Sequence, residues 1–164
     1  MAKGDLFLKL EGVKSGVIKG EAHDSVHEKE IDIIGWSWMM DAPEEVRGGG
    51  RTGRASMRPI RFTKMADSAT TALMSAMYNN EKMKKAVLTV RKTSGAAAID
   101  YLVITLKDAF VTRFEIEFQD APAPGLIERF DLRFAEIDVT YSSQDSRGHK
   151  QGAMSFNAQV SLQP

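Results

Sequence analysis

Residues 127–141 read IERFDLRFAEIDVTY, and the alternation of apolar and polar residues in this segment predicts a β-rich fold. Phe130, Leu132 and Phe134 share one parity, as they would in a strand with one face on a core. After Ala135 the apolar residues continue with the opposite parity. We expect a β-bulge or a sharp coil there, and such a feature would let a sheet curl toward a barrel.

Further strands are expected on both sides of this segment. In the last of them, apolar residues from Met154 to Leu162 alternate with polar ones, so we expect one of its faces to pack on the core. Turn sequences such as the Pro- and Gly-containing run 121–125 separate many of the segments. The other expected strands are Leu6–Leu10, Glu30–Trp38, Met57–Lys64, Ala86–Lys92, Tyr101–Phe110 and the alternating segment 113–118.

One α-helix is expected, over residues about 67–80. Asp67 or Ser68 could cap its start, and Asn79-Asn80 would end it. The residues that recur at helical spacing along one side are Ala69, Leu73, Met74, Met77 and Tyr78. The chain is therefore expected to be one domain over residues 1–164 and mostly β, a compact β-barrel of two packed, largely antiparallel sheets with one flanking helix.

Composition limits the class of function. Lys plus Arg and Asp plus Glu both number 22, so the net charge is zero, whereas a dedicated nucleic-acid-binding protein usually has a basic excess. The chain has no cysteine for a disulfide or a thiolate metal site. Its N-terminus has no apolar run typical of a secretory signal peptide, and no apolar stretch is long enough to span a membrane. We expect synthesis in the cytoplasm and no membrane insertion.

A long Gly/Arg-rich loop is expected over residues about 41–56. Glycines let backbone N–H groups approach an anion, which raises the possibility of phosphate binding. The Lys-Ser/Thr pair of a P-loop is absent, however, and a strand rather than a helix is expected to follow, so nucleotide binding is disfavoured. The central residues of the loop are Gly48, Gly49, Gly50, Arg51, Thr52, Gly53 and Arg54.

The arginines in and after this loop need a partner. A basic arm could bind nucleic acid, but the zero net charge favours ion pairs with a neighbouring subunit. A matching acidic stretch lies elsewhere in the chain, at Glu21, Asp24, Glu28, Glu30 and Asp32.

Other candidate sites are weaker. His23 and His27 are four residues apart, a spacing that could serve a metal on a helix. That segment lacks helical periodicity and a third ligand, so solvated loop histidines are the better interpretation, and His149 belongs to a turn. No Gly-x-Ser-x-Gly elbow is present. We therefore expect no catalytic residue, no metal and no cofactor.

Ordered blocks run along the chain: Asp5–Val13, Lys19–Glu21, Asp24–His27, Glu30–Trp38, the Gly-rich loop, Phe62–Lys64, Leu88–Lys92, Tyr101–Asp108, Glu128–Ile137, and Tyr141 followed by Gln144 and Gly148. Together they resemble the haemolysin-coregulated protein (Hcp) family, the tube subunits of type VI secretion systems. The resemblance covers nearly the whole chain. Two departures stand out: the loop is unusually rich in arginine, and Met154-Ser155-Phe156 stands where many members have a tryptophan-containing segment.

The resemblance implies a structural protein and not an enzyme. Its subunits would form hexameric rings that stack into a hollow tube, and sheath contraction would expel the tube without a cleaved signal peptide. The implied partners are other copies of the chain, a spike protein at the tip, the contractile sheath and secreted effectors in the lumen. The loop at Gly48–Arg54 would reach the adjacent ring. The alternative is a monomeric β-barrel that carries a small molecule or an effector.

Overall fold

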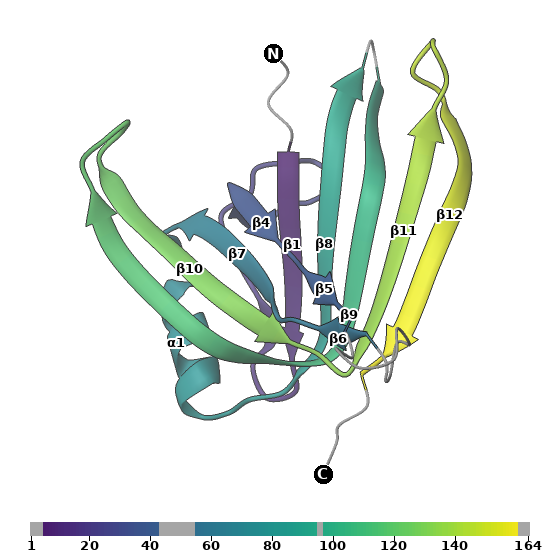
Figure 1. Cartoon of the computed structure of the whole chain (residues 1–164). Coiled ribbons are helices and arrows are strands. Elements are labelled where there is room, and N and C mark those ends of the chain that lie inside the picture. The colour runs from purple at the N-terminus through teal and green to yellow at the C-terminus, as the bar shows by residue number, and fades with distance from the viewer. Residues whose placement is uncertain (1–4, 43–54, 95–96, 161–164) are drawn as a thin grey trace.

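The computed structural model describes residues 5–42, 55–94 and 97–160 (Figure 1). Within these residues the chain forms twelve strands, all paired antiparallel, and one helix. The predicted mostly β fold with one helix is confirmed. The elements are β1 (Asp5–Gly12), β2 (Gly16–Ile18), β3 (Ile31–Ile33), β4 (Gly35–Ser37), β5 (Met40–Asp41), β6 (Ser56–Met57), β7 (Ile60–Met65), α1 (Thr70–Tyr78), β8 (Met83–Ser94), β9 (Ala97–Gln119), β10 (Gly125–Arg133), β11 (Glu136–Gln144) and β12 (Lys150–Gln159).

The long strand β9 belongs to two sheets. Its first half pairs with β8 and β11, and its second half pairs with β10. Between the halves, Asp108 has a positive φ of 50°, a conformation that non-glycine residues seldom adopt. The two segments that we expected as separate strands, 101–110 and 113–118, are therefore one bent strand.

The segment opposite this bend, between β10 and β11, contains the predicted parity change. β10 ends at Arg133 and β11 begins at Glu136, so the sharp coil is confirmed as a break between two strands. At the break, the Ala135 N–H donates to the carbonyl oxygens of Lys107 (3.1 Å) and Asp108 (3.2 Å). β10 and β11 thus follow β9 around its bend on the same side.

The two sheets meet along β9 and approach each other again at β3 and β4. β3 pairs with β1, β4 pairs with β7, and only Ile34 separates them. The predicted strand Glu30–Trp38 is therefore divided between two sheets. Because β3 and β4 pair with different neighbours, the sheet does not close into the barrel that we predicted. Instead, Figure 1 shows two wings that open toward one end: one contains the β9–β10 hairpin, and the other contains β11 and β12.

The helix α1 is shorter than expected and buries a different side. The chain leaves the helix at Asn79, as predicted, but the predicted cap at Asp67 or Ser68 was wrong: the N-cap residue is Ala69, whose N–H donates to the Asp67 carboxylate (2.9 Å) before the helix begins. Ala69, Leu73 and Ala76 face the protein. The two alanines have small side chains, so the helix can lie close to β9. The expected apolar side was partly wrong: Met74, Met77 and Tyr78 are exposed.

A buried ion cluster lies next to the start of α1. Lys64 Nζ is 2.5 Å from Glu128 Oε2 and 2.8 Å from Asp67 Oδ1. The side chains of Lys64 and Glu128 are fully buried, and they lie directly opposite each other on β7 and β10. Removing charges from water is costly, and the attraction between opposite charges offsets this cost only when each charge keeps its partner. The cluster therefore holds β7, β10 and the start of α1 together as long as the lysine and both carboxylates are present.

We expect Lys64→Met to lower the free energy of unfolding by about 3 kcal/mol, because it leaves the buried Glu128 carboxylate without its counter-ion. Urea unfolding followed by tryptophan fluorescence would measure this loss, since Trp36 and Trp38 are partly buried against the core. As a control, Lys107→Met removes an exposed lysine and should change the free energy by less than about 0.5 kcal/mol. Adding Glu128→Leu to Lys64→Met should recover much of the loss; no recovery would contradict the ionic explanation.

Candidate functional site

The strand β12 carries an exposed apolar surface. Its register aligns Leu88, Ile104, Val139 and Phe156 in one row across β8, β9, β11 and β12. Leu88 and Ile104 are buried at one end of the row, whereas Phe156 is 43% exposed at the other. The face that packs on the core therefore continues beyond it.

The neighbouring row shows the same gradient. Val90 is buried, Leu102 is half-buried, Tyr141 is exposed and Met154 is 62% exposed. We call Tyr141, Met154 and Phe156 the β12 patch. The prediction that this whole face of the last strand packs on the core was wrong for Met154 and Phe156, although Ala158 does pack there.

The outer edge of β12 is also open. Among the described strands β12 pairs with β11 alone, so its second edge presents unpaired backbone groups. Exposed edges of this kind are templates for pairing with another chain. An open edge and an apolar face on the same strand together form a surface suited to protein association.

The other face of β11 and β12 is polar. Thr140 faces Ser155, Gln159 Nε2 donates to Glu136 Oε1 (3.2 Å), and Lys107 lies 3.9 Å from Glu136. A hollow of about 310 Å³ on these strands is lined mainly by such groups. This face offers hydroxyl and amide groups, the opposite charges of Lys107 and Glu136, and the carboxylate of Asp138.

A second exposed apolar surface lies at the end of the β9–β10 hairpin. Phe118 and Leu126 are paired across the two strands, and Ile116 lies two residues before Phe118. All three are exposed, Phe118 at 64%. We call these three residues the hairpin patch. On the opposite face of the hairpin, ion pairs join Arg129 to Glu117 and Arg113 to Glu115, each at 2.8 Å.

The segment between β2 and β3, which carries most of the acidic stretch, is anchored within the subunit. Arg91 contacts Asp24 (2.6 Å) and Asp5 (2.8 Å). The hydrogen bond from Arg91 holds the pKa of Asp24 well below its usual value. Glu30 also has an internal partner, and the exposed Glu21 accepts the backbone N–H of Ser68 (3.2 Å), whereas Glu28 is exposed.

The internal partner of Glu30 is His27. The His27 ring is buried, stacks on Phe7 with centroids 4.5 Å apart, and places Nδ1 2.5 Å from Glu30 Oε2. The interpretation of His27 as a solvated loop histidine was therefore wrong. His23 is exposed and His149 lies in an exposed turn beside Asp145, as expected.

The central residues of the Gly/Arg-rich loop, Gly48 to Arg54, lie outside the described residues. The ends of the loop are paired: β5 and β6 align Met40 with Met57, and Arg58 contacts Asp41 at 3.1 Å. Figure 1 shows β6 near the end of β12 at Gln159 and away from the start of β1 at Asp5. The base of the basic loop and the Asp5–Arg91–Asp24 cluster are thus at opposite ends of the subunit.

In residues 5–42, 55–94 and 97–160, no three His, Asp or Glu side chains are grouped so that they could hold a metal ion. In the same ranges, no helix has the length and apolar character needed to cross a membrane.

Comparison with known proteins identifies relatives along nearly the whole chain. The family model described as "Type VI secretion system effector, Hcp" matches residues 7–141. The chain is 35% identical over 150 residues to Protein hcp1 of Pseudomonas aeruginosa, covering 90% of this chain and 89% of that protein. It is 26% identical over 153 residues to the Major exported protein of the same organism, covering 85% and 89% of the two chains.

Solved structures with the same fold include two from type VI secretion. One, described as a type six secretion system protein, has a TM-score of 0.84 at 22% identity and covers 95% of each chain. Another, a type VI secretion system effector from Yersinia pestis, has a TM-score of 0.73 at 25% identity and covers 95% of this chain and all of that one.

The ion pair of Asp24 predicts a pH dependence. Because the pKa of Asp24 is lower in the folded protein than in the unfolded chain, the pair stabilises the fold above about pH 4 and loses that effect as the pH falls through the folded-state pKa. Asp24→Asn should therefore lower the urea midpoint at neutral pH, and the difference from wild type should shrink below about pH 4. Glu28→Gln, at an exposed carboxylate, is the control. A constant difference at every pH would contradict the assignment.

Proposed function

The chain belongs to the Hcp family of type VI secretion proteins, and on that basis we propose that it is the structural subunit of a type VI inner tube. In this proposal six copies form a ring, and rings stack into a hollow tube that sheath contraction expels from the cell. The protein would be secreted through this apparatus, and the name of its relative, Major exported protein, agrees with that route. Its partners would be other copies of itself, the spike protein, the sheath and effectors in the lumen.

The observation that carries the proposal is the β12 patch on an open strand edge. Fully burying a large apolar side chain contributes about 1.5–3 kcal/mol, and the isolated subunit leaves much of this gain unused at Met154 and Phe156. A ring of identical subunits would bury the patch against a different surface of the next copy, as heterologous interfaces require.

The interior of the subunit favours assembly over the alternative of a monomeric carrier. A carrier barrel needs space for a ligand between its sheets. Here the fully buried side chains between the sheets include large ones such as Phe62 and Phe130, whose rings stack with centroids 5.2 Å apart. Phe62 and Phe130 take up room that a ligand would need.

The distribution of charge supports stacking of the rings. The base of the basic loop lies at one end of the subunit, and the cluster of Asp5 and Asp24 with Arg91 lies toward the other. Asp24 and Glu30 are already paired within the subunit, and Glu21 accepts the Ser68 N–H, so the exposed Glu28 is the better partner in the acidic stretch for arginines of an adjacent ring.

The polar face of β11 and β12 suits a lumen wall. Hydroxyl and amide groups cover most of this face, Lys107 and Glu136 oppose each other's charge, and Asp138 adds one negative charge. Such a wall would let cargo of either charge pass without strong retention.

We expect Phe156→Asp to prevent ring formation while leaving the subunit folded, because it places a charge in the proposed interface at a position that is partly exposed in the monomer. Native mass spectrometry would show wild type at six times 18.1 kDa and the variant as a monomer. Ser155→Asp, on the opposite face of the same strand, is the matched control and should keep the ring. A wild type that stays monomeric at every accessible concentration would refute the ring.

We expect Arg51→Glu combined with Arg54→Glu to weaken stacking of the rings, because the reversed charges would face the acidic stretch of the adjacent ring. Electron microscopy and sedimentation would show single rings where wild type forms tubes. Lys107→Glu combined with Lys84→Glu makes the same change of charge on exposed positions of described strands and serves as the control. Unchanged tube formation in the arginine variant would contradict the role of the loop.

A further inference from the structure

The hairpin patch has the same origin as the β12 patch. Phe114, Phe130 and Phe62 form a row across β9, β10 and β7 in which Phe62 and Phe130 are fully buried. The pairing of β7 with β10 ends at Ile127, and the Ala66 N–H then donates to the Leu126 carbonyl oxygen (3.0 Å), so Phe118 and Leu126 lie where the sheet narrows to the two-stranded end of the hairpin. There the face of the sheet that packs on the core becomes a solvent-exposed apolar surface.

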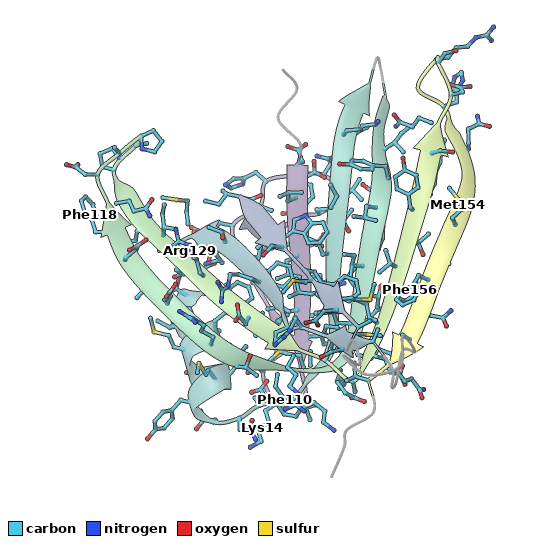
Figure 2. All side chains as sticks on the ribbon, in the orientation of Figure 1. Lys14, Phe110, Phe118, Arg129, Met154 and Phe156 are labelled. Carbon is cyan, nitrogen blue, oxygen red and sulfur yellow. The ribbon has the colours of Figure 1, made fainter. Side chains whose placement is uncertain are left out.

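The two patches are placed so that neighbouring subunits could join them. Figure 1 shows the β9–β10 turn and the β11–β12 turn on opposite sides of the molecule but at the same end. Figure 2 shows Phe118 on one wing and Met154 and Phe156 on the other. In a ring whose axis runs along the wings, rotation brings one wing of a subunit beside the opposite wing of the next at the same height.

The charges beside the two patches are complementary. Asp120 is exposed at the hairpin turn, two residues after Phe118. Arg147 and Lys150 are exposed at the β11–β12 turn. Asp145, the acidic residue of that turn, accepts the backbone N–H groups of residues 147 and 149 and is held within the turn. The acidic Asp120 thus accompanies the hairpin patch, and a turn in which Arg147 and Lys150 outnumber Asp145 accompanies the β12 patch.

We propose that the hairpin patch of one subunit receives the β12 patch of the next copy. This inference rests on the proposed ring and names the second of its two surfaces. Ile116, Phe118 and Leu126 would cover Tyr141, Met154 and Phe156 of the neighbour, with Asp120 near the neighbour's basic turn. The contact is heterologous, so it can repeat around a ring and leave no patch exposed when the ring closes.

The first test is Phe118→Asp, examined by native mass spectrometry. Phe118 is mostly exposed in the subunit, so the variant should keep the wild-type circular dichroism spectrum and lose the ring. Tyr78→Asp is the matched control, because Tyr78 is a 91% exposed aromatic residue on α1, outside both patches. Wild type and Tyr78→Asp should form rings. A Phe118→Asp variant that still forms rings would overturn this inference and leave the ring proposal intact, whereas a monomeric wild type would refute the ring itself.

The second test identifies the partner surface. The chain has no cysteine, so Phe118→Cys combined with Phe156→Cys introduces two thiols without background reaction. Assembled rings treated with a flexible bis-maleimide should give a ladder of covalent species up to six chains on a denaturing gel. Each single variant should give no ladder, because a heterologous contact does not bring two copies of the same position together. The flexible linker tolerates small differences of register, so intact rings of the double variant without a ladder would overturn the pairing.

Discussion

The bend of β9 at Asp108 is the constraint on which the rest of the fold depends. β9 belongs to both sheets. The Ala135 N–H donates to the carbonyl oxygens of Lys107 and Asp108, and this fixes the break between β10 and β11 beside the bend. Because β10 and β11 both pair with β9 on the same side, the two wings diverge from β9. Each wing then extends its core-facing surface beyond the core, and so the same bend creates both exposed apolar patches.

Much of this architecture follows from residue patterns. The parity change after Phe134 predicted the break that separates β10 from β11, and the alternation in the other segments predicted the strands. A stronger signal was overlooked: Lys64 has the core parity of Ile60 and Phe62, and Glu128 has that of Phe130 and Leu132. Two opposite charges at core positions of two strands predict a buried ion pair, which is what the structure contains.

The candidate site was harder to predict, for a physical reason. Alternation shows that one face of a strand avoids water, but it does not show whether that face is covered by the same chain or by another. Met154 and Phe156 were therefore assigned to the core of the subunit. The burial of His27 was missed for a similar reason, since its partners Phe7 and Glu30 come from different segments and only the fold brings the ring and Phe7 together.

The open edge of β12 has a consequence for the supply of subunits. If the ring forms as proposed, an unassembled copy is the form most prone to wrong association, because it presents unpaired backbone and apolar side chains together. Folding stability is then coupled to the amount of protein, since assembly removes the folded monomer from its equilibrium with the unfolded chain. A cell that makes this protein would gain from rapid assembly or from a temporary cover for the edge, and the thermal midpoint of the purified protein would rise with its concentration.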